Sequence, residues 1–261
     1  MRLGITPYVN ARPLSRGLAQ EPDVELLYAT PARLADLLRA GALDAALVSS
    51  SEYFSGNYRL IPGQAISASS AGADALLYSN VELHLLRSVA LDSASLSSNL
   101  LLRLVLHWLS PGAAIEFAVR PQDALRSLAE LDACLLIGDS ALEARGCTPH
   151  SLDLPVLWFE HTGLPMVLTV WLAQKDAGAE VDAVVQRAAQ RGLLEMEQIV
   201  RETAQRMHWD VAFAQQYLTG ALDYGWSERH VRALELFGQL LDEVGLLSVA
   251  NGYASGGASG G

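Results

Sequence analysis

The chain has 261 residues, of which 51% are hydrophobic and 18% charged, which is enough apolar sequence for one large domain or two modest ones. The formal net charge is −11 and the 18 basic residues are scattered, so we expect no nucleic-acid partner. No apolar run reaches the length of a signal peptide or a membrane helix, so we expect a cytoplasmic protein that binds no membrane.

The first third of the chain alternates short apolar runs with helical patterns, which favours parallel strands joined by crossover helices. A short helix is expected from about Pro13. Residues 31–40 carry apolar side chains at helical spacing, with Pro31 in the first turn and Gly41 at the expected C-terminal cap. The strands of this third are expected at residues 3–5, 24–28 and 45–48.

The middle of the chain begins a second alternation of the same kind. Residues 92–98 open a helix that is expected to run to about Leu109, and another helix is expected over 121–130. From about Glu180 to Leu246 nearly everything is amphipathic helix. The strands are expected at residues 89–91, 114–117 and 133–137, with one more at 167–172.

A middle unit with its own sheet, flanked on both sides by chain that can share another core, predicts an α/β protein of two lobes. We expect a central cleft between the lobes, two crossings near residues 79–87 and 164–169, and a helical C-terminal region. The expected bounds are residues 1–83 and 168–250 for the first lobe, 84–167 for the second, and 251–261 for a flexible tail.

Polar residues recur where the predicted strands end. Asn10 follows the first strand through a turn at Pro7, and Ser50 lies in the polar cluster Ser49–Tyr53 after the third strand. Open α/β sheets bind ligands at the carboxyl ends of their strands, so we expect Asn10 to orient a substrate. Its amide offers donors and an acceptor but cannot act as a base.

The segment Asp92–Ser98 places four hydroxyls directly before a helix, where free N–H groups and the positive helix end form a cradle for a carboxylate. In the alternative, one serine caps the helix and the others are solvated; four serines in so short a run favour ligand binding. Asp139 starts another helix after a strand and either holds a substrate hydroxyl or, as we favour, caps its own helix.

Residues 158–165 are expected to form a strand end or loop in which Thr162 and Gly163 meet a ligand. A tight turn that requires Gly and Pro explains the same residues equally well. His161 fits a surface or structural residue better than an acid.

We expect neither a metal nor a cofactor. Cys134 and Cys147 are too few for a tetrahedral zinc site, and two free thiols are expected. His107, His208 and His230 lack partners at metal-ligand spacing. The sequence has no glycine-rich phosphate loop and no nucleophile elbow.

Six short motifs stand at residues 5–14, 44–53, 76–79, 89–98, 136–139 and 162–165. Taken together, in their order and spacing, they resemble the chorismate dehydratase family of menaquinone biosynthesis by the futalosine route. The resemblance implies the two-lobed fold of type II periplasmic binding proteins. It also implies a hydro-lyase, a carbon-oxygen lyase that converts chorismate to 3-[(1-carboxyvinyl)oxy]benzoate.

The resemblance implies catalytic roles for Asn10 and for Ser79, which ends the Leu-Leu-Tyr-Ser strand. Ser97 stands where the family more often has Thr, so the hydroxyl is kept, whereas Arg12 stands at a variable position and its role stays open. The expected substrate-binding residues are Ser50, Ser97, Ser98, Asp139, Thr162 and Gly163.

The implied reaction removes the ring C3 hydrogen and the C4 hydroxyl of chorismate and forms an aromatic ring. No strong base stands among the matched residues. The hypothesis is therefore that the enolpyruvyl carboxylate of the substrate takes the proton, while Asn10 and Ser79 hold that carboxylate and the departing hydroxyl.

The sequence leaves two other functions open. A sister enzyme of the same pathway and fold, which makes dihydroxynaphthoate, is disfavoured by the opening motif Tyr8–Leu14. A non-catalytic small-molecule binding protein of the same fold is expected to carry an export signal or a partner domain, and the sequence shows neither. The sequence leaves the oligomeric state open, a homodimer included.

Overall fold

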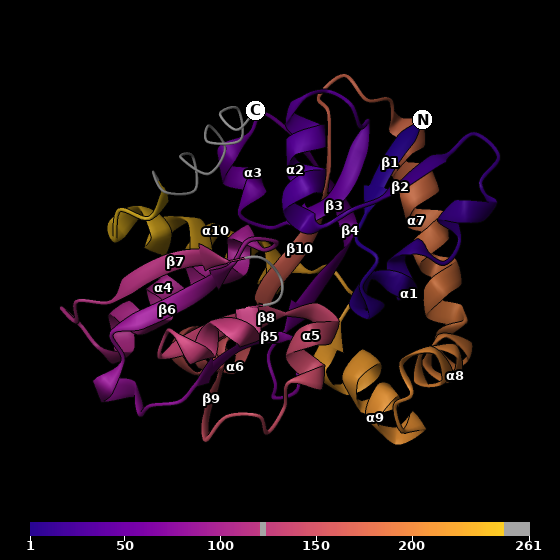
Figure 1. Cartoon of the computed structure of the whole chain (residues 1–261). Helices are drawn as coiled ribbons and strands as arrows, with labels where there is room; N and C mark the ends of the chain where they lie inside the picture. Colours follow the sequence, from indigo (N-terminus) through magenta and orange to yellow (C-terminus); the bar gives the residue numbers. More distant parts are fainter. Residues whose placement is uncertain (121–123, 248–261) are drawn as a thin grey trace, which may run out of the picture.

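The computed structural model describes residues 1–120 and 124–247, and in these residues two β-sheets form, each with helices around it (Figure 1). The first sheet has six strands in the order β11-β4-β10-β3-β1-β2. β1 pairs in parallel with β2 and β3, whereas β10 runs antiparallel between β3 and β4. The strands are β1 (Arg2–Ile5), β2 (Glu25–Tyr28), β3 (Ala45–Ser49), β4 (Arg59–Ala68), β10 (Met166–Ala173) and β11 (Leu222–Asp223).

The second sheet has five strands in the order β7-β6-β8-β5-β9. β6 pairs in parallel with β7 and β8, and β5 runs antiparallel between β8 and β9. β3, β5 and β8 are buried at every position, which explains their unbroken apolar runs. The strands are β5 (Ala75–Ser79), β6 (Ser88–Asp92), β7 (Glu116–Arg120), β8 (Ala133–Ile137) and β9 (His150–Asp153).

The helices divide between the two sheets. Around the first sheet lie α1 (Arg12–Ser15), α2 (Pro31–Arg39), α3 (Glu52–Ser55), α7 (Ala179–Leu194) and α8 (Met196–Met207). Around the second lie α4 (Leu96–Leu109), α5 (Gly138–Glu143) and α6 (Leu154–Thr162). The chain closes with α9 (Val211–Gln215), a π-helix over Gln216–Ala221 and α10 (Glu228–Glu243).

Local sequence explains the ends of α2. The Thr30 hydroxyl accepts a hydrogen bond from the Arg33 N–H, Pro31 opens the first turn, and Gly41 follows the last turn with a φ of +66°. The helix predicted over 31–40 is confirmed.

The predicted α/β architecture of two lobes is confirmed, but the expected first crossing is wrong. β5 pairs with β8 and β9, so the chain enters the second lobe between Ala68 and Ala75, before residues 79–87. The second crossing lies between Thr162 and Met166, close to the expected place. An apolar run such as 75–78 fits either sheet, and only its pairing decides which.

Two further local predictions differ from the structure. The expected loop over 158–165 is mostly helix α6, because the Asp153 carboxylate accepts from the Val156 N–H at its start and Gly163, with a φ of +69°, ends it. The expected helix over 121–130 is a 3-10 helix at Ala124–Ala129. Residues 121–123 and the expected tail 251–261 lie outside the described residues.

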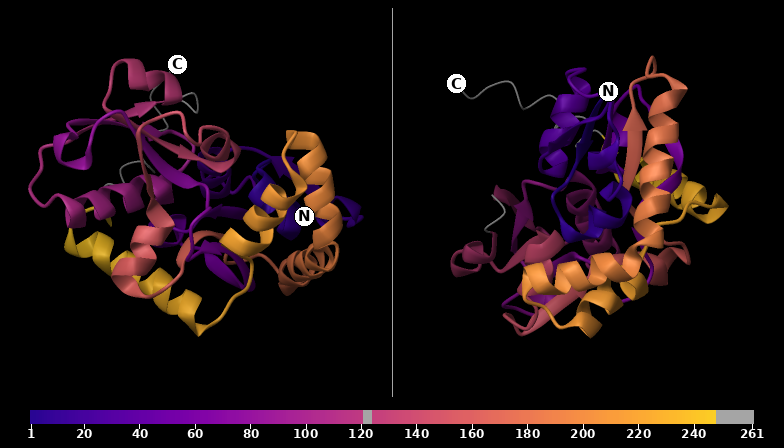
Figure 2. Two further views of the ribbon diagram at one scale, coloured as in Figure 1. Left: turned by 90° about the horizontal axis from the view of Figure 1, so that it is seen from below. Right: turned by 90° about the vertical axis from the view of Figure 1, so that its right-hand side faces the viewer.

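The helical C-terminal region is confirmed. Figure 2 shows α7 and α8 along the first lobe and α10 beneath the second. α10 contacts both β10 and α4, so this helix joins the two lobes. Within the described ranges, no helix combines the length and apolar character that a bilayer crossing requires.

Candidate functional site

A cavity lies between the two lobes, where the ends of strands from both sheets meet. We call it the cleft. Its first-lobe wall comes from the segment after β1, the end of β3 and β10, and its second-lobe wall comes from the start of β5, the end of β8 and the start of α4. It is lined by Thr6, Tyr8, Asn10, Pro31, Ser49, Asp74, Ala75, Ser95, Ser98, Ile137, Gly138, Leu168 and Thr169.

Asn10 lines the cleft, as the sequence predicts. It sits in a short 3-10 helix after β1 and is 8% exposed. Its Nδ2 atom donates to Asp74 Oδ2 at 2.6 Å, across the boundary between the lobes. Its Oδ1 atom is buried and has no partner among the described residues. Because a buried acceptor without a partner costs free energy, this atom is suited to a ligand donor.

Asp74 is the residue of the cleft that the sequence reading missed. It precedes β5, is 3% exposed, and accepts from the Tyr217 hydroxyl at 2.8 Å as well as from Asn10. Burial raises the pKa of this carboxyl, although the two hydrogen bonds oppose the shift. A second missed residue is Thr169 on β10, whose Oγ1 atom is also buried without a partner in the described residues.

The serines that precede α4 divide between two tasks. Ser95 is the N-cap: its Oγ accepts from the Ser98 N–H at 3.3 Å and donates to Ser98 Oγ at 2.9 Å, and both residues line the cleft. Ser98 therefore lies at the cleft, and its contact with a ligand stays a prediction.

Ser97 and Ser50 lie between the lobes but do not line the cleft. Ser97 Oγ lies 3.2 Å from Ser50 Oγ and accepts from the Ser51 N–H at 2.9 Å. These bonds join the start of α4 to the end of β3. Their hydroxyls form hydrogen bonds between the lobes and neither residue is among those that line the cleft, so their contact with substrate stays a prediction.

Asp139 does not cap its own helix, contrary to our expectation. Ile137 is the N-cap residue of α5, and the Asp139 carboxylate instead accepts from the Val9 N–H at 3.1 Å, across the lobes. Burial raises the pKa of Asp139 to about 6. Asp139 thus holds the segment that carries Asn10.

The structure does not bring Ser79 together with Asn10. Ser79 is the last residue of β5, and its hydroxyl donates to the Val81 carbonyl at 2.8 Å and lines a different cavity. β5 runs away from the cleft, so Ser79 lies about 13 Å along the strand from Ala75.

Thr162, Gly163 and His161 also lie away from the cleft lining. Thr162 Oγ1 donates to the Trp158 carbonyl at 2.8 Å, and the Gly163 carbonyl accepts from Arg229 at 2.8 Å. The ring of His161 stacks on Trp108 with the centroids 3.9 Å apart. These contacts are those of a helix end, as the turn alternative supposes.

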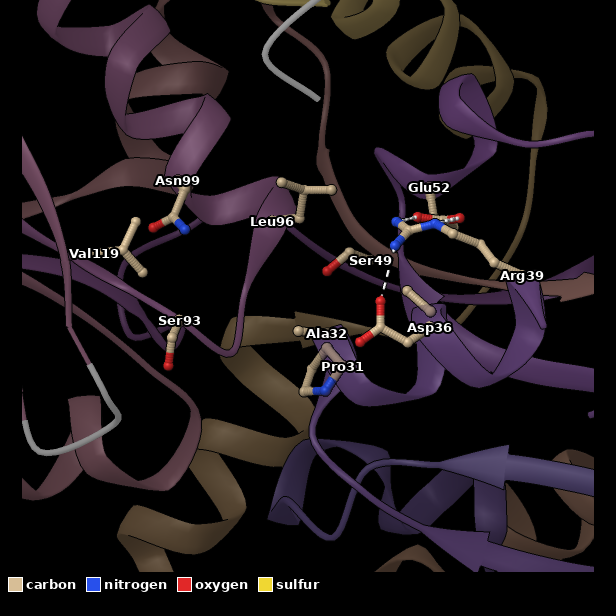
Figure 3. Close-up of a pocket in the computed structure, with 11 residues that line it drawn as sticks. Pro31, Ala32, Asp36, Arg39, Ser49, Glu52, Ser93, Leu96, Asn99 and Val119 are labelled. Carbon is tan, nitrogen blue, oxygen red and sulfur yellow. Dashed lines mark hydrogen bonds and ion pairs between the residues drawn. The ribbon is translucent and has the colours of Figure 1, made fainter. Parts of the chain in front are cut away.

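A second cavity adjoins the cleft and shares Pro31 and Ser49 with it (Figure 3). On its first-lobe side, Arg39 pairs with Asp36 at 3.0 Å and with the fully buried Glu52. Because two carboxylates surround this guanidinium, it has no charge to spare for an anion. Ser93 and Asn99 stand on the opposite side, from the second lobe.

A third cavity shares Thr6 and Tyr8 with the cleft and carries three arginines, Arg12, Arg16 and Arg206. Arg12 pairs with Glu202 at 2.7 Å, and Arg16 pairs with Glu202 and Glu195, each at 2.7 Å. Arg206 is exposed and forms no ion pair within the described part of the chain, although its charge acts on the nearby Asp139. It is the cation in excess beside the cleft.

Cys134 is buried and Cys147 exposed, both as free thiols, as predicted. In residues 1–120 and 124–247, no group of three or more His, Cys, Asp and Glu side chains is arranged to hold a metal ion.

Comparison with known proteins agrees with this architecture. A family model described as menaquinone biosynthesis matches residues 1–243. A chorismate dehydratase of Thermus thermophilus is 31% identical over 238 residues, which cover 83% of this chain and 86% of that protein.

Two solved structures share the fold. A protein of Archaeoglobus fulgidus superposes with a TM-score of 0.77 at 18% identity, over 94% of this chain and 97% of that one. The periplasmic aliphatic sulphonate binding protein SsuA of Escherichia coli superposes with a TM-score of 0.62 at 16% identity, over 95% and 93%. The fold is therefore that of periplasmic binding proteins.

Proposed function

The chain belongs to the menaquinone biosynthesis family, and from that premise we propose that it is a chorismate dehydratase. The observation that carries the proposal is the identity of 31% to a chorismate dehydratase over 83% of the chain. The reaction we propose is that of a hydro-lyase: chorismate loses one molecule of water and becomes 3-[(1-carboxyvinyl)oxy]benzoate.

The cleft supports this chemistry by positioning. Elimination takes the ring C3 proton and the C4 hydroxyl, and the aromatic product supplies the driving force. We assign the proton to the enolpyruvyl carboxylate of the substrate, as the sequence suggested, and the orientation of the substrate to Asn10. Ser79 lies at the far end of β5. We therefore assign the contacts between serine hydroxyls and the substrate to Ser95 and Ser98 at the start of α4.

Incubation of the purified protein with chorismate tests the proposal. We expect chorismate to disappear and an aromatic enolpyruvyl ether to appear, followed by ultraviolet absorbance and mass spectrometry. The variant Asn10→Ala is expected to lose about 100-fold in kcat, since it removes a polar contact to the reacting groups. Undiminished turnover by this variant would refute the role of Asn10.

A non-catalytic small-molecule binding protein is the second candidate, because the fold is shared with a sulphonate-binding protein. The same assay separates the two. A binding protein returns chorismate unchanged at every enzyme concentration, whereas a dehydratase converts it in proportion to the protein added.

A further inference from the structure

The amide of Asn10 is held by two other buried residues, Asp74, which lines the cleft beside it, and Tyr217. Asp74 Oδ2 accepts from Asn10 Nδ2 at 2.6 Å and from the Tyr217 hydroxyl at 2.8 Å. The exposed fractions are 8% for Asn10, 3% for Asp74 and 1% for Tyr217. Tyr217 stands on the π-helix after α9, so the C-terminal helices reach the cleft through this contact.

This arrangement decides which end of the amide is left without a protein partner and so available to a ligand. An asparagine side chain carries an acceptor and a donor of nearly the same shape, and its partner selects between them. Asp74 Oδ2 accepts two hydrogen bonds and is therefore the oxygen without a proton, so the NH2 group of Asn10 must face it. The carbonyl oxygen of Asn10 is left buried with no protein partner in the described residues.

We propose that Asp74, held by Tyr217, is a positioning residue that turns the carbonyl oxygen of Asn10 toward the substrate. This inference rests on the proposed dehydratase function. The oxygen thus presented accepts a hydrogen bond from the C4 hydroxyl of the bound substrate and fixes its orientation; the enolpyruvyl carboxyl group, which takes the C3 proton, gives it to the departing hydroxide, so that water leaves. Asp74 acts through Asn10 and does not itself take the ring proton.

A double-mutant cycle on kcat/KM for chorismate tests the inference. In Asp74→Asn, the new amide can present either its NH2 group or its oxygen to Asn10. The orientation of the Asn10 amide is then no longer fixed. We expect this variant to lose about tenfold in kcat/KM, and we expect it to cause less than about twofold further loss in an Asn10→Ala background. Losses that multiply in the double variant would overturn the proposal. They would mean that Asp74 acts on the substrate itself, for example as the base, and not through Asn10.

Tyr217→Phe provides a second cycle should Asp74→Asn fail to fold. It keeps the ring but removes the hydroxyl that marks Asp74 Oδ2 as an acceptor. We expect a loss of about threefold to tenfold that also vanishes in the Asn10→Ala background. Asp153→Asn is the matched control: this carboxyl is partly buried in the same lobe and caps α6, and the variant should keep the activity of the wild type.

Nuclear magnetic resonance of the side-chain amide provides a readout that needs no substrate. The two amide protons of Asn10 are assigned by their loss in Asn10→Ala. We expect one of them to shift and to exchange faster with water in Asp74→Asn and Tyr217→Phe. Unchanged resonances would overturn the inference, whereas absent turnover by the wild type with shifted resonances would overturn only the proposed function.

Discussion

Asp92 shows what burial does to a single carboxyl near the cleft. It ends β6, is 2% exposed, and accepts one hydrogen bond, from the Ala94 N–H to Oδ1 at 2.7 Å. Loss of hydration raises its pKa to about 6. Folded protein therefore binds this proton more tightly than unfolded protein, whose Asp pKa is about 3.9.

The pH dependence of stability follows from that difference. Below about pH 4, Asp92 is protonated in both the folded and the unfolded protein. As the pH rises from about 4 to above about 6, the unfolded protein loses this proton first, so the contribution of Asp92 lowers the free energy of unfolding by about 2 to 3 kcal/mol. We expect Asp92→Asn to unfold at higher urea than the wild type above pH 7 and at similar urea near pH 4. Asp139, with a pKa of about 6 from burial, contributes in the same direction, so the variant should retain part of the slope. Parallel pH profiles of the two proteins would contradict the assignment.

At the scale of elements, the direction of one strand explains most of what the sequence reading missed. The alternation of apolar runs predicted parallel strands, whose carboxyl ends share one edge, and this correctly placed Asn10 and Ser98 at the cleft. β5 runs antiparallel, so its amino end meets the cleft. The residue before the strand, Asp74, therefore lines the cleft and the residue that ends it, Ser79, does not.

Pairing direction is set by contacts far apart in sequence, and no local pattern in residues 75–79 reports it. The same limit applies to Asp139 and to Ser97. Their side chains reach backbone or hydroxyl groups of the other lobe, and the spacing along the chain shows neither contact. Helix ends such as those of α2 depend on adjacent residues, and these were predictable.

Gly138, where β8 passes into α5, allows the lobes to approach. Its φ is +61°, and a Cβ atom at this position would lie 3.2 Å from the ring of Tyr8 in the other lobe. We expect Gly138→Ala to lower the free energy of unfolding by about 1 to 2 kcal/mol because of the backbone conformation, and by a further ~1 kcal/mol because of the contact with Tyr8. We also expect it to raise KM, since Gly138 and Tyr8 both line the cleft.

Gly112→Ala is the matched control, with a φ of +78° and no atom within 4 Å of the added Cβ. Urea unfolding of both variants separates the backbone cost from the contact with Tyr8. In a Tyr8→Ala background the difference between the two glycine variants should vanish. A difference that persists there would mean that the ring contact is not its cause.

At the scale of the whole molecule, a negatively charged protein must bind a negatively charged substrate. The net charge is −11, chorismate carries two carboxylates, and the cleft is lined by Asp74 without a basic side chain among its lining residues. The third cavity, which shares Thr6 and Tyr8 with the cleft, supplies positive charge. Arg12 and Arg16 are balanced by Glu202 and Glu195, which leaves Arg206 as the positive charge in excess beside the cleft.

Arg206→Gln should therefore raise KM for chorismate by about threefold to tenfold at low ionic strength while kcat stays the same, because Arg206 attracts the substrate without touching the reacting atoms. Salt screens this attraction over about 10 Å at 0.1 M, so the difference from the wild type should shrink as salt is added. Arg201→Gln is the matched control: it removes the same charge from the same helix, α8, but Arg201 does not line the cavity. Steady-state kinetics at two salt concentrations measures both effects. If the two variants raised KM equally, the attraction would belong to the net charge of the protein and not to the position of Arg206.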